Sequence, residues 1–421
     1  MIAKPKKPTR FQKLSRLSSV IVTGFSLFLY IINGFQRKKL TTNGYHFHQI
    51  SGCILLGCIL SKSTLDSTRR LIMKSHFIKN IAIANFKCFQ KLQLDGMESV
   101  NLFGGKNNVG KTAFLEAVEL LVSSNETYDL AVNIYNLLTR RQLNQDSTDL
   151  ILDLIKEDQS QIKISTENKI CEMYLNKQTD GFGFDPEFNE EMENIIPTTS
   201  LSLAINGNEK SIPVERLLTT KMPLLKERNL KRDNVNLIGS AKTEEREIAV
   251  LYGSLVDLDR EDFLNDSLRL FDDNIISIKQ RATKNNVILK LKLKDRQTPV
   301  LLSSLGEGLN RYIAVLCAIW ASKDGFLLID EVENGIHYTN YKKLWHIIFQ
   351  ASAEANCQLF ITSHSKECLE AFNEVQLEDN KNSGAYFEFY KNLKTDLITA
   401  SKRDKEQLNY SLTHQGRLRG E

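Results

Sequence analysis

The stretch VNLFGGKNNVGKTAFLEAVELL, residues Val100 to Leu121, contains three local patterns in succession. It begins with an apolar run typical of a buried strand, passes through a glycine-rich turn and continues as a helix. The turn matches the pattern G-x-x-x-x-G-K-[ST], from Gly105 to Thr112. Glycines let backbone N–H groups surround phosphate oxygens, and the N-terminus of the following helix attracts their negative charge. The stretch therefore predicts a phosphate-binding loop between a strand and a helix.

The polar positions of this loop have expected roles in holding a nucleoside triphosphate. Lys111 would reach the β- and γ-phosphates, and the Thr112 hydroxyl would ligate Mg²⁺. A glycine turn that arose by chance is the alternative, but the strand before it and the helix after it both fit the phosphate-binding arrangement. ATP and Mg²⁺ are therefore the expected cofactors. The other nucleotide-binding positions of the loop are Gly105, Asn107, Asn108 and Gly110.

The composition is that of an ordinary globular protein with one strong asymmetry in charge. Of the 421 residues, 42% are hydrophobic and 25% are charged. The seven cysteines include no C-x-x-C pair, which favours reduced, buried thiols in a cytoplasmic protein over a zinc or disulfide framework. Residues 1–72 hold 12 Lys/Arg and one acid, whereas residues 73–421 hold 43 basic and 50 acidic residues. The first 72 residues therefore need a separate explanation.

Three interpretations of residues 1–72 are open: an uncleaved membrane anchor, a disordered extension, or translated sequence upstream of the true start. Basic residues precede an apolar run of 13 residues, VIVTGFSLFLYII, and no small-residue cleavage site follows it. The run is shorter than the ~20 residues of a membrane-spanning helix. Met73 is the first methionine after Met1, and the patterned sequence starts directly behind it. We favour the third interpretation and expect a chain that begins at Met73 to fold and hydrolyse ATP.

Two further strand ends carry acidic and histidine side chains. The segment GFLLIDEVENGIHY places four apolar residues directly before Asp330 and Glu331. A buried strand delivers such residues to the carboxyl edge of a sheet, where Asp330 would bind Mg²⁺ and Glu331 would deprotonate the attacking water. In CQLFITSHSKECLEAF, a second apolar strand ends at Ser363 and His364. A lone histidine there is more often structural, but in this series His364 is expected to sense the γ-phosphate by hydrogen bonding.

The segment LSSLGEGLNRYIAVLCAIW, Leu302–Trp320, opens a helix with a serine and glycines. Its apolar residues recur at helical spacing. Free N–H groups at the helix N-terminus and the Ser304 hydroxyl can bind an anion. An N-capped core helix without a ligand is the simpler interpretation of the segment in isolation. Its position, one helix before the acidic strand, favours the anion-binding interpretation.

Four features follow one another along the chain: the glycine-rich loop, the serine-glycine segment, the acidic strand and the strand that ends at His364. Their order resembles that of the ATP-binding-cassette (ABC) class of ATPases. Within that class the chain is similar to the heads of SMC, RecF and OLD proteins and to the stand-alone prokaryotic AAA-type ATPases grouped with them. This resemblance implies that Ser304 and Gly306 contact the γ-phosphate across a dimer, and that Glu331, His364 and Lys111 are catalytic. The resemblance is carried by IANFKCF (83–89), FGGKNNVGKT (103–112), SSLGEGLNR (303–311), IDEVENGIH (329–337) and TSHS (362–365).

The resemblance implies an α/β fold, namely a P-loop NTPase with an ABC-ATPase-like head and an antiparallel β-subdomain. It also implies an inserted α+β segment between the P-loop (Gly105–Thr112) and the signature (Ser304–Gly308). We expect residues 73–421 to form this head, with its core at 77–122 and 286–400 and an insertion or lid at 123–285. Leu305 replaces the first glycine of the ABC transporter signature. No glutamine fits a Q-loop, and no heptad run predicts a coiled-coil arm. The residues after His364 lack the acidic cluster of a Toprim nuclease, so we expect no nuclease activity.

These features favour a cytoplasmic, Mg²⁺-dependent ATPase that forms an ATP-dependent homodimer. We expect dimer formation to act on an unidentified effector protein, in DNA maintenance or phage defence. An ATP-binding subunit of a transporter is the alternative, against which the signature departure and the long insertion argue. A membrane-anchored ATPase is a further alternative if residues 1–72 are native. Nucleic acid is supported only by the basic run KMPLLKERNLKR, Lys221–Arg232, in an otherwise acidic body.

Overall fold

The computed structural model describes residues 76–141, 153–155, 161–177, 199–217, 234–284, 287–379 and 383–414. Residues 1–72 and the basic run Lys221–Arg232, on which the sequence raised separate hypotheses, lie outside these ranges. Within the described ranges, no helix has the length and apolar character needed to cross a membrane.

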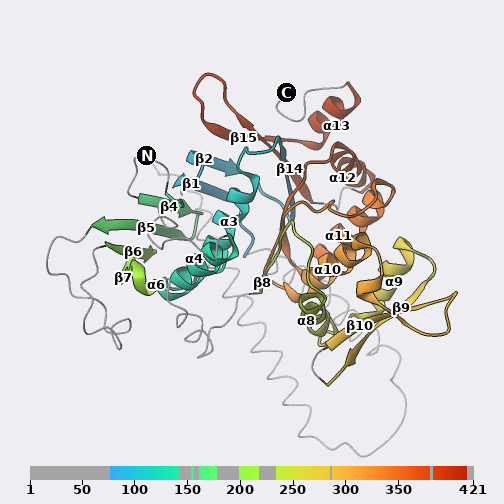
Figure 1. The fold of residues 1–421 in the computed structure, drawn as a ribbon. Helices are drawn as coiled ribbons and strands as arrows, with labels where there is room; N and C mark the ends of the chain where they lie inside the picture. Colours follow the sequence, from blue (N-terminus) through green and yellow to red (C-terminus); the bar gives the residue numbers. More distant parts are fainter. Residues whose placement is uncertain are drawn as a thin grey trace, which may run out of the picture. The chain divides into compact units, whose positions relative to one another are not determined.

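A six-stranded sheet in the order β15-β14-β3-β13-β12-β8 forms the centre of the fold (Figure 1). Neighbouring strands run parallel from β14 to β8, and only β15 is antiparallel to its neighbour. Strands buried on both faces need near-continuous apolar sequence, as β12 has. This arrangement confirms the predicted α/β class. The strands are β3 (Val100–Gly105), β8 (Val235–Ile238), β12 (Phe326–Ile329), β13 (Gln358–Thr362), β14 (Gly384–Lys391) and β15 (Ile398–Arg403).

Strand β8 belongs to the core sheet, although its residues fall within the predicted insertion. The predicted insertion spans residues 123–285, yet β8 pairs in parallel with β12, from Val235 opposite Phe326 to Ile238 opposite Ile329. The core therefore takes one strand from the segment that was assigned to the insertion. The pairing satisfies backbone groups of β12 that would otherwise be left open at an edge of the sheet.

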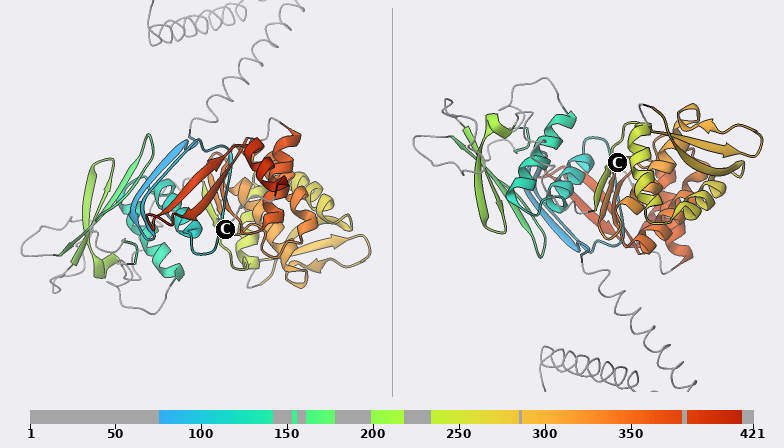
Figure 2. Two further views of the ribbon diagram at one scale, coloured as in Figure 1. Left: turned by 90° about the horizontal axis from the view of Figure 1, so that it is seen from above. Right: turned by 90° about the horizontal axis from the view of Figure 1, so that it is seen from below.

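Helices cover both faces of this sheet (Figures 1 and 2). Alternate residues of β13 divide between the two cores, since Phe360 packs with α3 and α4, whereas Leu359 and Ile361 pack with α10, α11 and α12. Helix α13 follows β15 and begins with a capping box between Asp404 and Gln407. The helices are α3 (Lys111–Val122), α4 (Thr127–Arg141), α10 (Glu307–Ala321), α11 (Tyr341–Ala355), α12 (Lys366–Glu378) and α13 (Lys405–Thr413).

Phe103 lies at the centre of an aromatic group directly below the glycine turn. Its ring stacks on those of Phe387 and Phe360, with centroids 5.3 and 6.3 Å away, and packs against Phe114 at 4.5 Å. All four rings are fully buried, and each such side chain contributes about 1.5–3 kcal/mol through burial. The group joins β3, β13, β14 and α3, so it fixes the strand and the helix that flank the turn.

A second, antiparallel sheet in the order β2-β1-β4-β5-β6-β7 packs on the other side of α3, which contacts β1 and β4. Strands β1, β4 and β5 have the sequences NIAIANF, QIKIS and ICEMYLNK, and the sheet that they help to form confirms the predicted antiparallel subdomain. Its elements are β1 (Asn80–Phe86), β2 (Phe89–Asp95), β4 (Gln161–Ser165), β5 (Ile170–Lys177), β6 (Thr199–Ile205), β7 (Asn208–Pro213) and the short helix α6 (Val214–Leu217).

A third, three-stranded sheet in the order β11-β10-β9 precedes the signature segment. Its inner face buries Ile278, Leu289 and Leu291 in the same core as α8, α9 and α10. Figure 2 shows the β9–β10 hairpin at an outer edge of the fold. The elements are α8 (Glu245–Val256), α9 (Glu261–Phe271), β9 (Ile275–Ala282), β10 (Val287–Leu293) and β11 (Val300–Leu301). Strand β11 is followed directly by the 3₁₀ helix η2 (Leu302–Ser304), and a second 3₁₀ helix, η3 (Tyr338–Asn340), precedes α11.

Candidate nucleotide-binding site

The turn between β3 and α3 has a backbone that only glycine permits at two positions. Gly105 and Gly110 have φ angles of 139° and 86°. A Cβ on Gly105 would lie 2.4 Å from the Phe389 carbonyl oxygen, and one on Gly110 would lie 2.6 Å from Cys88 Sγ. Both the torsion and the close approach therefore exclude larger residues. The loop is held against β14 on one side and against the β1–β2 connection on the other.

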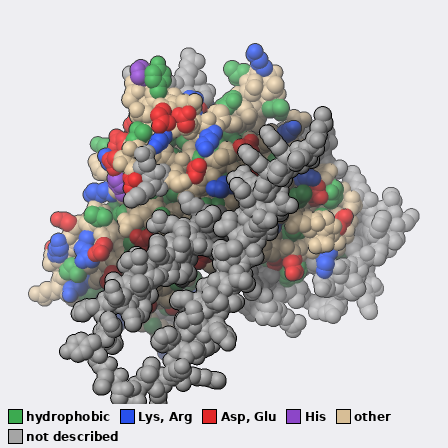
Figure 3. All heavy atoms as spheres, turned by 180° about the vertical axis from the view of Figure 1, so that it is seen from behind, with side chains coloured by type: hydrophobic (Ala, Val, Ile, Leu, Met, Phe, Trp, Pro, Cys, Tyr) green, Lys and Arg blue, Asp and Glu red, His purple; other side chains and the backbone are tan. Residues whose placement is uncertain are grey.

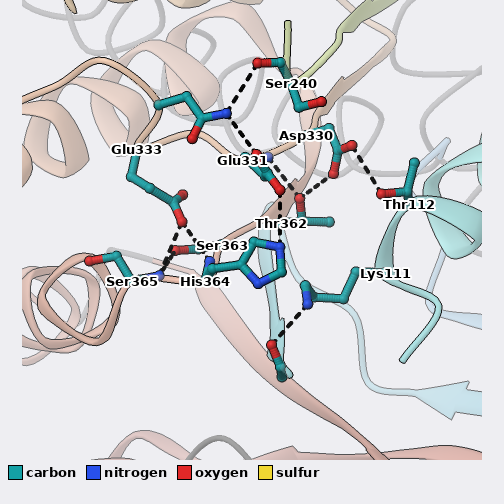
Figure 4. Close-up of polar contacts among 12 residues, drawn as sticks. Lys111, Thr112, Ser240, Asp330, Glu331, Glu333, Thr362, Ser363, His364 and Ser365 are labelled. Atoms are coloured by element: carbon teal, nitrogen blue, oxygen red, sulfur yellow. Dashed lines mark hydrogen bonds and ion pairs between the residues drawn. The ribbon is translucent and has the colours of Figure 1, made fainter. Parts of the chain in front are cut away.

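Lys111 is the first residue of α3, and its side chain curls back over the loop (Figure 4). Its Nζ donates to the carbonyl oxygens of Gly105 at 2.8 Å and Lys106 at 2.7 Å. The residue is 5% exposed, and this burial lowers the pKa of Lys111 to about 8 although nearby carboxylates favour its charged form. An ammonium group in such a loop can exchange its carbonyl partners for phosphate oxygens.

Thr112 and Asp330 meet at the carboxyl edge of the central sheet (Figure 4). Thr112 Oγ1 donates to Asp330 Oδ2 at 3.0 Å, and Thr362 Oγ1 donates to Oδ1 at 2.6 Å. A hydroxyl and a carboxylate suit Mg²⁺, which takes one or two protein ligands and fills its other positions with water and phosphate oxygens. Among the described residues no cluster of three or more His, Cys, Asp or Glu offers another metal site. The Thr112–Asp330 pair thus fits the expected ion.

Glu331 has a left-handed backbone conformation, with a φ of 53°, which costs a residue with a side chain about 1–3 kcal/mol. Its N–H donates to Thr362 Oγ1 at 2.8 Å, and its carbonyl oxygen accepts from Arg311 Nη2 at 3.1 Å. The side chain is held as well, since Oε1 lies 3.0 Å from His364 Nε2 and Oε2 accepts from Asn334 Nδ2 at 2.7 Å. Neighbouring groups therefore hold the backbone of Glu331 and engage both of its carboxylate oxygens.

His364 is positioned by the carboxylate of Glu333. Glu333 Oε1 accepts the backbone N–H groups of His364 at 2.5 Å and Ser365 at 3.0 Å, while Ser365 Oγ caps α12 by accepting from the Cys368 N–H. The other carboxylate oxygen of Glu333 is buried and has no hydrogen-bond partner among the described residues. The turn that carries His364 is thus tied to the loop that follows β12.

Arg311 connects the signature helix α10 to the ends of two strands. It is 4% exposed, and desolvation lowers the pKa of its guanidinium while the nearby Asp330 carboxylate opposes the shift. Its Nη1 donates to the Gly239 carbonyl at 2.5 Å, and its Nη2 donates to the carbonyls of Asp330 at 2.5 Å and Glu331 at 3.1 Å. The planar fork of arginine can make these three contacts at once.

Ser304 and Gly306 lie apart from this group. Ser304 ends η2, Gly306 precedes α10, and both are exposed, with open space where a Cβ of Gly306 would lie. Within the described residues no hydrogen bond joins either of them to the loop of residues 105–112. The structure therefore brings together Lys111, Thr112, Asp330, Glu331 and His364, leaves the signature facing outward, and exposes Asn107 and Asn108 on the loop surface.

Two family models match the chain in overlapping segments. The model described as "AAA ATPase domain" matches residues 77–244, and the model described as "AAA domain, putative AbiEii toxin, Type IV TA system" matches residues 186–370. Between them they include the P-loop, the signature, the acidic strand and His364. Over residues 77–370 the chain is therefore similar to AAA ATPase domains. This similarity is consistent with the SMC/RecF/OLD-like branch that the sequence resembles.

Relatives of this ATPase include a protein named "ATP/GTP phosphatase" from Helicobacter pylori (strain ATCC 700392 / 26695). It is 28% identical over 334 residues, which cover 71% of this chain and 88% of the relative. An uncharacterised protein from Methanocaldococcus jannaschii is 32% identical over 92 residues, covering 21% of this chain and 41% of that protein. The AAA domains and the phosphatase relative together identify the chain as an enzyme that hydrolyses ATP.

Two solved structures of SMC heads also align with the chain. The SMC head domain from Thermotoga maritima covers 78% of this chain and 99% of its own length, with 11% identity and a TM-score of 0.40. The SMC head bound to the C-winged helix domain of ScpA covers 79% and 99%, with 9% identity and a TM-score of 0.46.

Four residues of the ATPase site were given no role by sequence reasoning: Thr362, Asn334, Glu333 and Arg311. Glu333 and Asn334 closely follow the acid pair Asp330 and Glu331 in the sequence. A further acid and an amide so close to the end of a buried strand could have indicated that they belong to the site. Arg311 is the last residue of the motif SSLGEGLNR (303–311). Its acceptors are backbone carbonyls, which every residue has, so the sequence could not indicate these contacts.

Proposed function

We propose that this ATPase is a Mg²⁺-dependent switch in which two chains form a dimer around bound ATP. Formation of the dimer then acts on a partner protein in the cytoplasm. One observation carries the proposal: the P-loop, acids and histidine form one site, while Ser304 and Gly306 face outward without touching it. A second chain related by a two-fold axis can place its signature against that site. Such an isologous pairing closes at two copies, with a nucleotide in each of two equivalent sites.

Binding of ATP would rest on the loop and the residues behind it. The backbone from Gly105 to Gly110 and the Lys111 ammonium bind the β- and γ-phosphates, with Asn107 and Asn108 at the exposed side of the loop. Thr112 and Asp330 would hold Mg²⁺, which neutralises charge on the phosphates when bound. Thr362 orients the Asp330 carboxylate through its 2.6 Å hydrogen bond.

Hydrolysis would require Glu331 to accept a proton from the attacking water. In the structure its carboxylate contacts His364 and Asn334. When His364 turns to the γ-phosphate, Oε1 is released and the base is free to act, whereas Asn334 continues to hold Oε2. ATP binding and activation of the base are linked in this way. Ser304 and Gly306 of the second chain complete the γ-phosphate contacts.

The partner is an effector protein, and we place the switch in DNA maintenance or phage defence. The description of one matching family model, which names an AbiEii toxin of a type IV TA system, supports such a role over a transporter subunit. The departure at Leu305 from the transporter signature argues in the same direction. The genes that flank this one would test the assignment, since a permease gene next door would favour transport.

Sedimentation velocity with and without ATP tests the dimer. Glu331→Gln keeps the shape of the base but cannot accept the proton, so it should bind ATP, hydrolyse it very slowly and accumulate as a dimer. Ser304→Arg should bind ATP and remain monomeric, because a bulky cation blocks close approach of α10. Wild type should dimerise transiently with ATP. An oligomeric state that ignores ATP in all three proteins would refute the switch while leaving nucleotide binding intact.

A further inference from the structure

The outer face of the β9–β10 hairpin carries a set of cations that the nucleotide site does not use. Side chains alternate between the two faces of a strand, and Ile278, Leu289 and Leu291 point into the core. The residues between them point outward. Four of these are basic, namely Lys279 and Arg281 on β9 and Lys290 and Lys292 on β10. We call them the basic face.

The basic face is concentrated and uncompensated. Residues 275–296 hold seven Lys/Arg and one Asp, within a body of residues 73–421 that is net acidic. The register places Lys290 directly opposite Lys279, where like charges destabilise a strand pair. In the described part of the chain, no ion pair joins any of the four to a carboxylate. On the part of the surface that Figure 3 shows, basic and acidic side chains are interspersed. The fold gains no stability from this repulsion, so the face is better suited to meeting an anion.

We propose that the basic face binds the phosphate backbone of duplex nucleic acid. Residues two apart on a strand lie about 6.6 Å apart, and neighbouring strands lie about 4.8 Å apart, so the sheet presents a rigid, regular array of cations. Duplex DNA offers a matching density, with one charge for about every 3.4 Å along each strand. Binding of this kind neutralises phosphates and reads no sequence.

The side chains between the cations distinguish this occupant from others. They are Ser277, Ile288 and, on β11, Leu301. None is aromatic, so the face lacks the stacking platform that single strands use. Two scattered aliphatic residues do not form the apolar centre of a stable protein interface, which an acidic protein partner would require. The proposal does not depend on the dimer switch, because all four cations belong to one chain.

Fluorescence anisotropy of the full chain with a labelled duplex of about 30 base pairs tests the proposal. Four phosphate contacts predict a slope of about −3.6 for the logarithm of affinity against the logarithm of salt concentration. The double variant Lys279→Glu/Lys290→Glu should lower the magnitude of the measured slope by about 2 and weaken binding about tenfold or more at low salt. Its ATP turnover should match wild type, because neither residue lies in the nucleotide site.

The matched control is Lys91→Glu/Lys394→Glu, which changes the net charge equally at exposed positions on β2 and in the β14–β15 turn. Residues 1–72 also carry a net +11, so the readout is the difference between the two double variants. The control should bind as wild type does. Equal loss in both variants, or none in either, would overturn the proposal. So would labelled poly-glutamate that binds the basic face and is not displaced by duplex.

A single substitution separates binding from folding. Lys290→Glu should raise the thermal midpoint, because it turns a repulsive cross-strand pair with Lys279 into an attractive one. The same change should weaken duplex binding. A variant that is more stable and binds less tightly shows that the lysine serves the ligand. Unchanged duplex binding in this better-folded variant would overturn the proposal.

Discussion

Several residues of the nucleotide site are held by hydrogen bonds between a side chain and a backbone group. Lys111 donates to two carbonyls, the Glu331 N–H is held by Thr362, and the turn of His364 donates to Glu333. These contacts fix where each group lies while leaving the Lys111 ammonium and the Glu331 carboxylate able to change partners. At the scale of single residues, the site is therefore preorganised for a ligand that replaces contacts already made.

Lys111 predicts a pH dependence of ATP binding. Burial lowers its pKa to about 8 in the free chain, and phosphate oxygens favour the charged ammonium, so the pKa is higher in the complex. Between these two values ATP binds together with a proton, and affinity should fall by up to about tenfold per pH unit above pH 8. Calorimetric titration from about pH 7.5 to 9.5, in two buffers of different ionisation enthalpy, measures this proton uptake. A dissociation constant that does not change over this range would contradict the prediction.

The same shift has a consequence for folding, with a sign that can be worked out. The unfolded chain titrates this lysine near 10.5 and the folded chain near 8, so the unfolded state binds more protons between these values. Stability rises with pH wherever the unfolded state binds more protons. The contribution of Lys111 to the free energy of unfolding therefore increases from about pH 8 to about pH 10.5, while ATP affinity falls.

At the scale of elements, local patterns predicted what local sequence determines. The apolar runs of β3, β12 and β13 are visible in the sequence, because strands buried on both faces need them. Strand β8 is four residues long, too short for a period, and only its distant partner β12 makes it part of the core. Likewise the sequence shows Arg311 on a helix but cannot show carbonyl acceptors, which every residue has.

The junction between α10 and the loop after β12 depends on Gly308. A Cβ at this position would lie 2.3 Å from the Gly335 carbonyl oxygen, a backbone atom that cannot move alone. Gly308→Ala should therefore lower the free energy of unfolding by about 1–3 kcal/mol, as overpacking does. It should also lower ATP turnover, because the displaced loop carries Asn334, which holds Glu331.

Gly253→Ala is the matched control for denaturant unfolding. Gly253 lies in α8 with open space where a Cβ would be, so alanine should raise the free energy of unfolding by about 0.5–1 kcal/mol. Equal stability of the Gly308→Ala and Gly253→Ala variants would show that the helix–loop contact is not tight.

At the scale of the whole molecule, helix α10 connects the basic face, which we propose as a binding surface, with the candidate nucleotide site. The basic face of β9 and β10 leads through β11 and η2 to Ser304, at the start of the signature. Arg311, one turn into α10, reaches back to the carbonyls of Asp330 and Glu331. A displacement of α10 by a second chain or by a ligand therefore reaches the strand end that carries Asp330 and Glu331.

Arg311→Lys tests this connection. Lysine keeps the charge, but its single ammonium cannot span the three carbonyls that the guanidinium fork contacts. The variant should bind ATP with unchanged affinity, since Arg311 does not contact the P-loop, yet release phosphate at least about tenfold more slowly, a loss of about 1.4 kcal/mol of transition-state stabilisation. Nucleotide titration and single-turnover phosphate release separate the two effects.

A double-mutant cycle with Ser304→Ala then distinguishes coupling from a simple loss of structure. If Arg311 transmits the position of the signature to Glu331, removing Ser304 should cost much less in the Arg311→Lys background than in wild type, because the route is already broken. We expect an interaction energy of about 1–2 kcal/mol, in the range of residues that act through one network. Strictly additive losses would mean that the two residues act independently, and that the signature influences hydrolysis only through its own contact with the nucleotide.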